Sequence, residues 1–120
     1  MNQETAAVFR LSIESTSIHA ASLALQQLEA ESDYPDELVV ALGRCLSRVM
    51  TGRFEKSGGA VYDRNREELL VWMGKAIISI LAAHGTPEAL AQVGQAATDA
   101  RFTLHVLETL MSRQIIRQTI

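Results

Sequence analysis

Cysteine and aromatic residues are scarce in this chain, and both shortages restrict its class. A single cysteine, Cys45, excludes an intramolecular disulfide. It lies in an apolar run, which is typical of a small buried residue in a reducing compartment. Aromatic residues make up 5% of the sequence, whereas hydrophobic residues make up 48%. A core of Ala, Leu, Ile and Val favours packed helices over a β-sandwich, in which Tyr, Phe, Trp and Thr are enriched.

Signals for export and membrane insertion are also missing. The first residues, MNQETAAVFR, have neither the basic n-region nor the apolar h-region of a secretory signal. The longest apolar run, residues 69–83, is interrupted by Lys75 and is short for a bilayer-spanning helix. A net charge of −3 argues against strong non-specific binding to nucleic acid, although it leaves room for a local basic patch. We expect one cytoplasmic domain over residues 1–120, with no membrane partner.

Four segments show the three- and four-residue spacing of apolar residues that predicts amphipathic helices. They cover residues 15–31, about 35–52, 63–84 and about 86–118. Between the last two, Gly85 predicts a helix end, Thr86 an N-cap and Pro87 a first helical turn.

Residues 7–14 fit two patterns. Phe9, Leu11 and Ile13 alternate with polar residues as in a strand, and the segment also fits as the start of the first helix. In the strand alternative, residues 15–17 (Ser-Thr-Ser) cap a shorter helix. Both alternatives stay open at this point.

Short connections between the segments predict antiparallel neighbours. The expected fold is therefore all-α, an antiparallel four-helix bundle with up-down-up-down topology and, in the strand alternative, a short N-terminal extended segment. The start of the first helix and the end of the fourth would then overhang at the same end. Their apolar side chains predict a homodimer interface, made of Phe9, Leu11, Ile13, Met111, Ile115 and Ile116.

Charge separates toward the two ends of this predicted bundle. Acids crowd the turn between the first two helices, and the helix dipole does not explain Glu29 and Glu31, because it disfavours carboxylates at a C-terminal end. Basic residues gather toward the other end, where planar arginine donors suit carboxylates or phosphates. Ordinary ion pairing with solvent-exposed acids explains the same arginines equally well. The predicted partner-binding set is Arg44, Arg48, Arg53, Lys56, Arg64, Arg66, Arg113 and Arg117.

Two stretches that look like known motifs give little evidence of function. In TGRFEKSGGAVY, residues 51–62, Lys56 lacks the preceding glycine of a phosphate-binding loop, so the stretch is a connection. Residues 34–53 superficially resemble a helix-turn-helix. However, the apolar stripe of Leu38, Leu42, Cys45 and Val49 passes through the glycine at position 43 without a break and predicts a single helix.

Residues with catalytic or metal-binding chemistry are scattered. His19 and His84 lack a spaced partner, and His105 with Glu108 supplies half of a metal site at most. Trp72 fits the core better than a ligand pocket, although a small-molecule sensor remains a third hypothesis. We therefore predict no catalytic residue, no metal and no cofactor.

The leading functional prediction is a small non-catalytic regulatory or inhibitory protein. It would bind a protein partner through the basic, partly apolar end of the bundle. The alternative is a nucleic-acid-associated regulator that contacts phosphates through Arg44, Arg48, Arg53 and Arg64.

Overall fold

The computed structural model describes residues 2–31, 35–55 and 60–119, with the backbone alone for 60–64 and 113–119. This part of the chain contains six α-helices and no strand, which confirms the predicted all-α fold. The helices are α1 (Gln3–Ile13), α2 (Ile18–Glu29), α3 (Glu37–Thr51), α4 (Ala60–His84), α5 (Pro87–Ala96) and α6 (Thr103–Thr119).

The N-terminal region forms two helices, so neither a strand at residues 7–14 nor one continuous helix is correct. Asn2 caps α1 by accepting a 2.8 Å hydrogen bond from the backbone N–H of Thr5. Ser17 begins α2 by accepting from the N–H of Ala20 at 3.4 Å. Phe9 and Ile13 are four residues apart and lie on one face of α1, where both are buried. Their apparent alternation with polar residues was therefore a helical spacing.

The predicted fourth helix is also divided, into α5 and α6. Between them the Asp99 carboxylate accepts a 3.0 Å hydrogen bond from the backbone N–H of Arg101. The Thr103 hydroxyl donates to the carbonyl oxygen of Ala97 at 2.8 Å. These side-chain bonds offer the backbone an alternative to helical pairing and form a turn. The described residues thus form six helices in place of the four predicted, and a four-helix bundle is not confirmed.

The second and third predicted helices correspond to α3 and α4. Gly52 ends α3 with a φ of 67°, and Gly85 follows α4 with a φ of 76°, a backbone conformation that glycine adopts without strain. Thr86 caps α5 through the N–H of Ala89 at 3.3 Å, and Pro87 occupies the first turn, as predicted.

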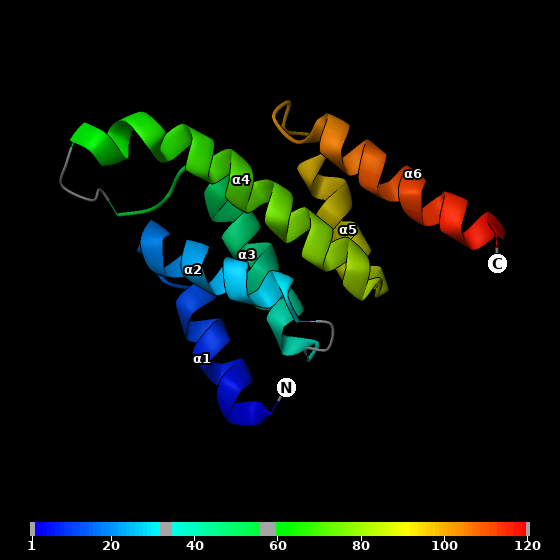
Figure 1. The fold of residues 1–120 in the computed structure, drawn as a ribbon, viewed down its shortest axis with the longest axis horizontal. Helices are drawn as coiled ribbons and strands as arrows, with labels where there is room; N and C mark the ends of the chain where they lie inside the picture. The colour runs from blue at the N-terminus through cyan, green and yellow to red at the C-terminus, as the bar shows by residue number, and fades with distance from the viewer. Residues whose placement is uncertain (1, 32–34, 56–59, 120) are drawn as a thin grey trace.

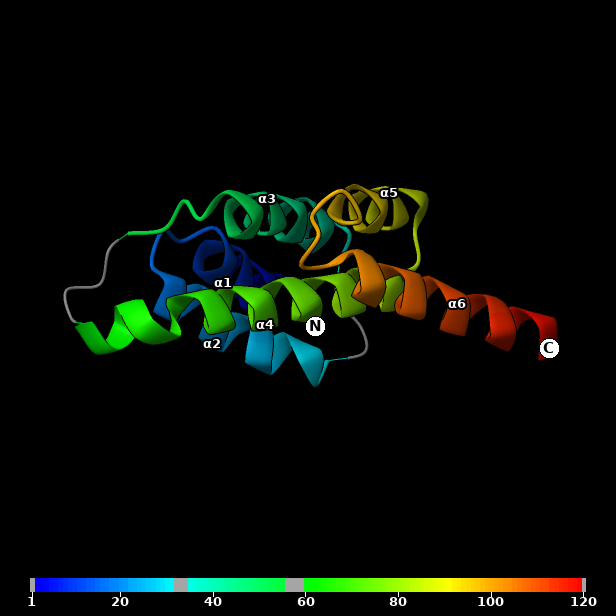
Figure 2. The same ribbon diagram turned by 90° about the horizontal axis from the view of Figure 1, so that it is seen from above.

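Helix α4 is the centre of the molecule and contacts α2, α3, α5 and α6. Figure 1 shows α4 crossing in front of α3 and α5, and Figure 2 shows α3 and α5 together as a layer on one side of it. Its fully buried side chains include Met73, Ile77, Ile78 and Leu81. The third predicted segment is therefore the core helix that its broad apolar surface indicated.

The predicted meeting of both termini with the 51–62 connection at one end is wrong. The N-terminal end of α4 and the C-terminal end of α6 lie at opposite extremes of the longest, 50 Å dimension (Figures 1 and 2). Helix α1 lies apart from α6 in both views. None of the described helices has the length and apolar content needed to cross a membrane.

Candidate functional site

Two of the predicted partner-binding arginines bind the break between α1 and α2. Arg44 on α3 pairs with the carboxylate of Glu14 at 2.8 Å. Arg48, one turn later, donates to the backbone carbonyl oxygens of Glu14 and Ser15, the latter at 3.2 Å. A cation at the C-terminal end of a helix satisfies carbonyl groups that lack helical partners. These arginines thus hold α1 against α3.

A third arginine holds the segment that follows α3. Arg66 donates to the carbonyl oxygens of Gly52, Phe54 and Glu55 at 3.3, 3.1 and 3.2 Å. Glu55 in turn donates its backbone N–H to the carbonyl oxygen of Thr16 at 2.8 Å. The two loops are therefore joined to each other, and much of the donor capacity of Arg48 and Arg66 is used inside the molecule.

The remaining predicted basic residues are Arg53, Lys56, Arg64, Arg113 and Arg117. Arg53 is exposed. The side chains of Lys56, Arg64, Arg113 and Arg117 lie outside the described residues. The part of α6 that carries the last two is at the opposite end of the molecule from the N-terminal end of α4 (Figure 1).

The sequence prediction missed Arg101, the most extensively bonded arginine in the described structure. It pairs with Asp99 at 2.8 Å and with Glu67 at 2.9 Å, and it donates to the carbonyl oxygen of Met50 at 3.0 Å. The hydrogen bond from Arg101 lowers the pKa of Asp99, and Asp99 raises the pKa of Arg101. Arg101 therefore ties the α5–α6 turn to α3 and α4.

The predicted dimer residues are divided between the core and two separate helices. Phe9 and Ile13 are 8% and 0% exposed, so neither is available at the surface. Leu11 on α1 and Met111 on α6 are exposed, but they lie on helices that are apart (Figures 1 and 2). The side chains of Ile115 and Ile116 are outside the described residues. No single apolar patch joins this set.

Helix α6 carries apolar side chains on two opposite faces. Phe102, directly before its first turn, and Val106 are buried against the body. Leu104, Leu107 and Met111 follow three- and four-residue spacing on the other side and are 68%, 51% and 60% exposed. We call these three residues the α6 apolar face. Because α6 packs mainly on α4 and α5 among the described helices and projects from the body (Figure 1), this face points away from the core.

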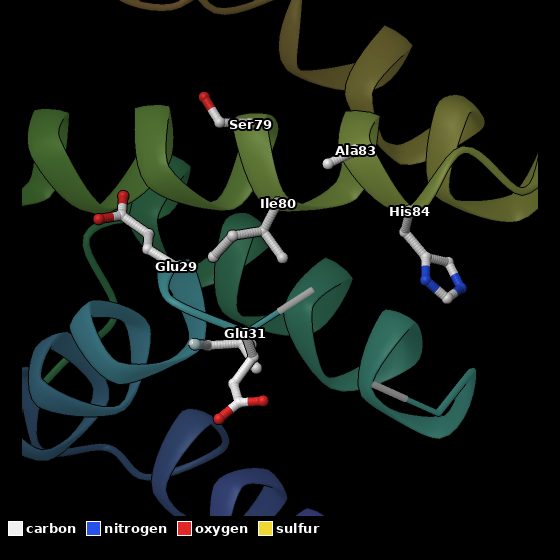
Figure 3. Close-up of a pocket in the computed structure, with 7 residues that line it drawn as sticks. Glu29, Glu31, Ser79, Ile80, Ala83 and His84 are labelled. Carbon is white, nitrogen blue, oxygen red and sulfur yellow. The ribbon is translucent and has the colours of Figure 1, made fainter. Parts of the chain in front are cut away.

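A groove of about 550 Å³ runs between the C-terminal ends of α2 and α4. Leu28 and Ile80 form its apolar floor, and Figure 3 shows Ile80 reaching from α4 toward the end of α2. We call it the α2–α4 groove; it is lined by Leu28, Glu29, Glu31, Ser79, Ile80, Ala83 and His84. Its size is within the range of small-molecule sites.

The polar side chains of this groove differ in their hydrogen bonds and ion pairs. His84 bonds to the carboxylate of Asp36 at 2.8 Å, and Ser79 bonds to His105 of α6 at 3.1 Å. Within the described residues, Glu29 and Glu31 take part in no ion pair. In Figure 3 the Glu29 carboxylate turns toward α4, whereas that of Glu31 points outward. The two carboxylates therefore stand at the rim without a cation.

The sequence-predicted structural role of Cys45 agrees with its placement. Its side chain is fully buried, and burial raises the pKa of the thiol from 9.0 to about 12. Trp72 is partly buried and packs against the core. Among the described residues, no three His, Cys, Asp or Glu side chains gather as a metal site requires.

Native protein should therefore react very slowly with a thiol reagent such as DTNB. At a fixed pH below its pKa, the raised value lowers the thiolate fraction roughly a thousandfold relative to a free cysteine. The measurement is the labelling rate at pH 8, with and without urea. A Cys45→Ala/Ser47→Cys variant, with its cysteine at an exposed position of the same helix, supplies the control. Rapid stoichiometric labelling of the native wild type would contradict the buried placement.

The described residues thus present two candidate surfaces, the α6 apolar face and the α2–α4 groove. Compared with known proteins, the chain matches no family model, no curated protein and no solved structure.

Proposed function

We propose that this chain is a small non-catalytic interaction protein that regulates or inhibits a protein partner by binding it through the α6 apolar face. The observation that carries the proposal is the exposure of Leu104, Leu107 and Met111 on the side of α6 opposite its buried residues. Apolar side chains aligned on a projecting helix cost solubility, and such patches mark interaction surfaces. The basic end that the sequence favoured is less well supported, because several of its arginines bind the chain's own loops.

The geometry suits recognition of a helix by a groove. An amphipathic helix places side chains at i, i+3 and i+7 into an apolar groove of its partner, and Leu104, Leu107 and Met111 have this spacing. Since α6 is attached at its N-terminal part, a partner can approach its exposed side without meeting α1, α2 or α3 (Figure 1). We therefore propose a partner with an apolar groove that is complementary to this side of α6.

The nucleic-acid alternative has weaker support. Arg44 and Arg48 are engaged with Glu14 and Ser15, whereas Arg53 is exposed. Phosphate binding through scattered arginines depends on free donors that converge on one strand of phosphates. The protein-binding proposal is therefore preferred.

A photo-crosslinking residue at position 107 should capture the partner in the native cell lysate. We expect p-benzoylphenylalanine at 107 to give a discrete adduct, because Leu107 is half exposed at the centre of the α6 apolar face. A second change, Met111→Asp, should remove that adduct by placing a charge in the apolar contact. Mass spectrometry identifies the captured protein, including a second copy of this chain.

The matched control places the same photoreactive residue at Val40, which is 54% exposed on α3. Adducts that are identical from positions 40 and 107, or an adduct at 107 that persists with Met111→Asp, would contradict binding through α6. Circular dichroism of each variant shows whether the fold is retained.

A further inference from the structure

The α2–α4 groove collects negative potential from several independent sources. The C-terminal end of α2 (Glu29) and that of α4 (His84) both line it. Each helix C-terminus carries about half a negative charge from the aligned peptide dipoles of the helix. The carboxylates of Glu29 and Glu31 add to this potential at the position where a helix dipole disfavours them. The sequence therefore places two acids where they oppose the stability of α2.

Beneath this charged rim the groove is apolar. Leu28 is fully buried and Ile80 is 6% exposed, and Ala83 extends the apolar wall along α4. An open groove with an apolar floor and carboxylates on one side is complementary to a molecule that has an apolar body and a cationic head. Sites for small molecules commonly combine apolar walls with a few placed polar groups.

We infer that the α2–α4 groove binds a small amphipathic organic cation, with its apolar body on Leu28 and Ile80 and its ammonium or guanidinium beside Glu29. Glu29 is the direct contact, because its carboxylate turns toward α4 in Figure 3. Glu31 points outward and acts as a more distant charge. This site does not include Leu104, Leu107 or Met111, and it does not depend on the function proposed for the α6 apolar face.

The test uses three probes of similar shape: phenethylammonium, the neutral 2-phenylethanol and the anionic 3-phenylpropionate. Each is titrated into ¹⁵N-labelled full-length protein, and amide shifts are followed by NMR. We expect phenethylammonium to shift the amides of residues 28–31 and 79–85 with saturation. The neutral probe should bind about three- to tenfold more weakly, and the anion more weakly still, as expected for one or two partly solvated charge contacts.

Three variants separate the direct contact of Glu29 with the cation from the weaker effect of more distant charges. Glu29→Gln should raise the Kd of phenethylammonium about three- to tenfold, and Glu31→Gln should raise it less than about threefold. Glu108→Gln, an acid exposed on α6, is the matched control and should leave the Kd unchanged. All three are surface substitutions that remove a charge and preserve side-chain shape.

Several results would contradict binding in this groove. For the probes, these are equal affinity of all three, shifts located elsewhere on the molecule, or no saturable shift up to about 10 mM, which is the weak limit for such fragments. For the variants, it is an equal effect of Glu29→Gln and Glu108→Gln on the Kd. Since none of them involves Leu104, Leu107 or Met111, failure of the cation site leaves the α6 proposal intact and separately testable.

Discussion

Replacing Gly74 by alanine is expected to lower the free energy of unfolding by about 1–3 kcal/mol, the usual cost of forcing an extra methyl group into a packed core. A Cβ at position 74 would overlap the ring of Phe102, which is fully buried and rigid. This clash outweighs the gain of about 1 kcal/mol that alanine normally brings to a helix interior. Urea denaturation followed by circular dichroism measures the change.

The same substitution at Gly94 is the matched control. Nothing lies within 4 Å of a Cβ built there, so Gly94→Ala should leave stability unchanged or raise it by up to about 1 kcal/mol. In a Phe102→Leu background the cost of Gly74→Ala should shrink, because the two positions share one contact. A stabilising Gly74→Ala, or a cost independent of residue 102, would show that α6 does not dock on α4 in this way.

Replacing Arg101 by methionine is expected to cost about 2–3 kcal/mol, since it removes charged hydrogen bonds and leaves their acceptors unpaired. Asp99 and the carbonyl oxygen of Met50 lose this donor, and the Asp99 side chain is only 15% exposed. Arg101→Lys should recover less than half of the loss, because a single ammonium does not reproduce a planar fork of donors. Arg44→Met, which breaks an exposed pair, should cost less than about 1 kcal/mol.

The Arg101 effect should depend on pH. Arg101 holds the pKa of Asp99 below its ordinary value of 3.8. The stability from this pair is therefore complete above pH 3.8 and is lost as the pH falls through the lower pKa of the folded state. The difference between wild type and Arg101→Met, measured by urea denaturation at pH 7 and pH 3, should be smaller at the lower pH. A difference that stays constant or grows on acidification would contradict the assigned pairing.

Sequence patterns predicted the helical class and those helix ends that depend on local chemistry. Thr86 and Pro87 start α5 as expected, and Gly52 and Gly85 adopt the left-handed conformation at helix ends. The two breaks in the predicted helices also have local signals. The Ser-Thr-Ser stretch at 15–17 was left open as the cap of a shorter helix, whereas Thr98-Asp99 was missed because the apolar stripe of the fourth segment continued across it. Residues that hydrogen-bond their own backbone compete with the helix, and side-chain periodicity does not register that competition.

The surfaces were less accessible to prediction because they depend on packing between distant segments. Leu28 and Ile80 line one groove although 52 positions separate them in the chain. The unusual position of Glu29 and Glu31 was visible in the sequence, but the apolar floor beside them was not. Conversely, Arg48 and Arg66 looked available for a partner in the sequence. The fold shows that both donate hydrogen bonds to backbone carbonyl oxygens of two loops.

The attachment of α6 at one end has a mechanical consequence. The helix has 17 residues, which at 1.5 Å each correspond to roughly 26 Å of length. With its base fixed beside α4 and its tip beyond the body, a tilt of about 10° at the base would carry the tip through roughly 4–5 Å on this helix length. Small adjustments at the base are therefore amplified at the tip. If α6 binds partners as proposed, it would match binding grooves that differ in direction while the core stays unchanged.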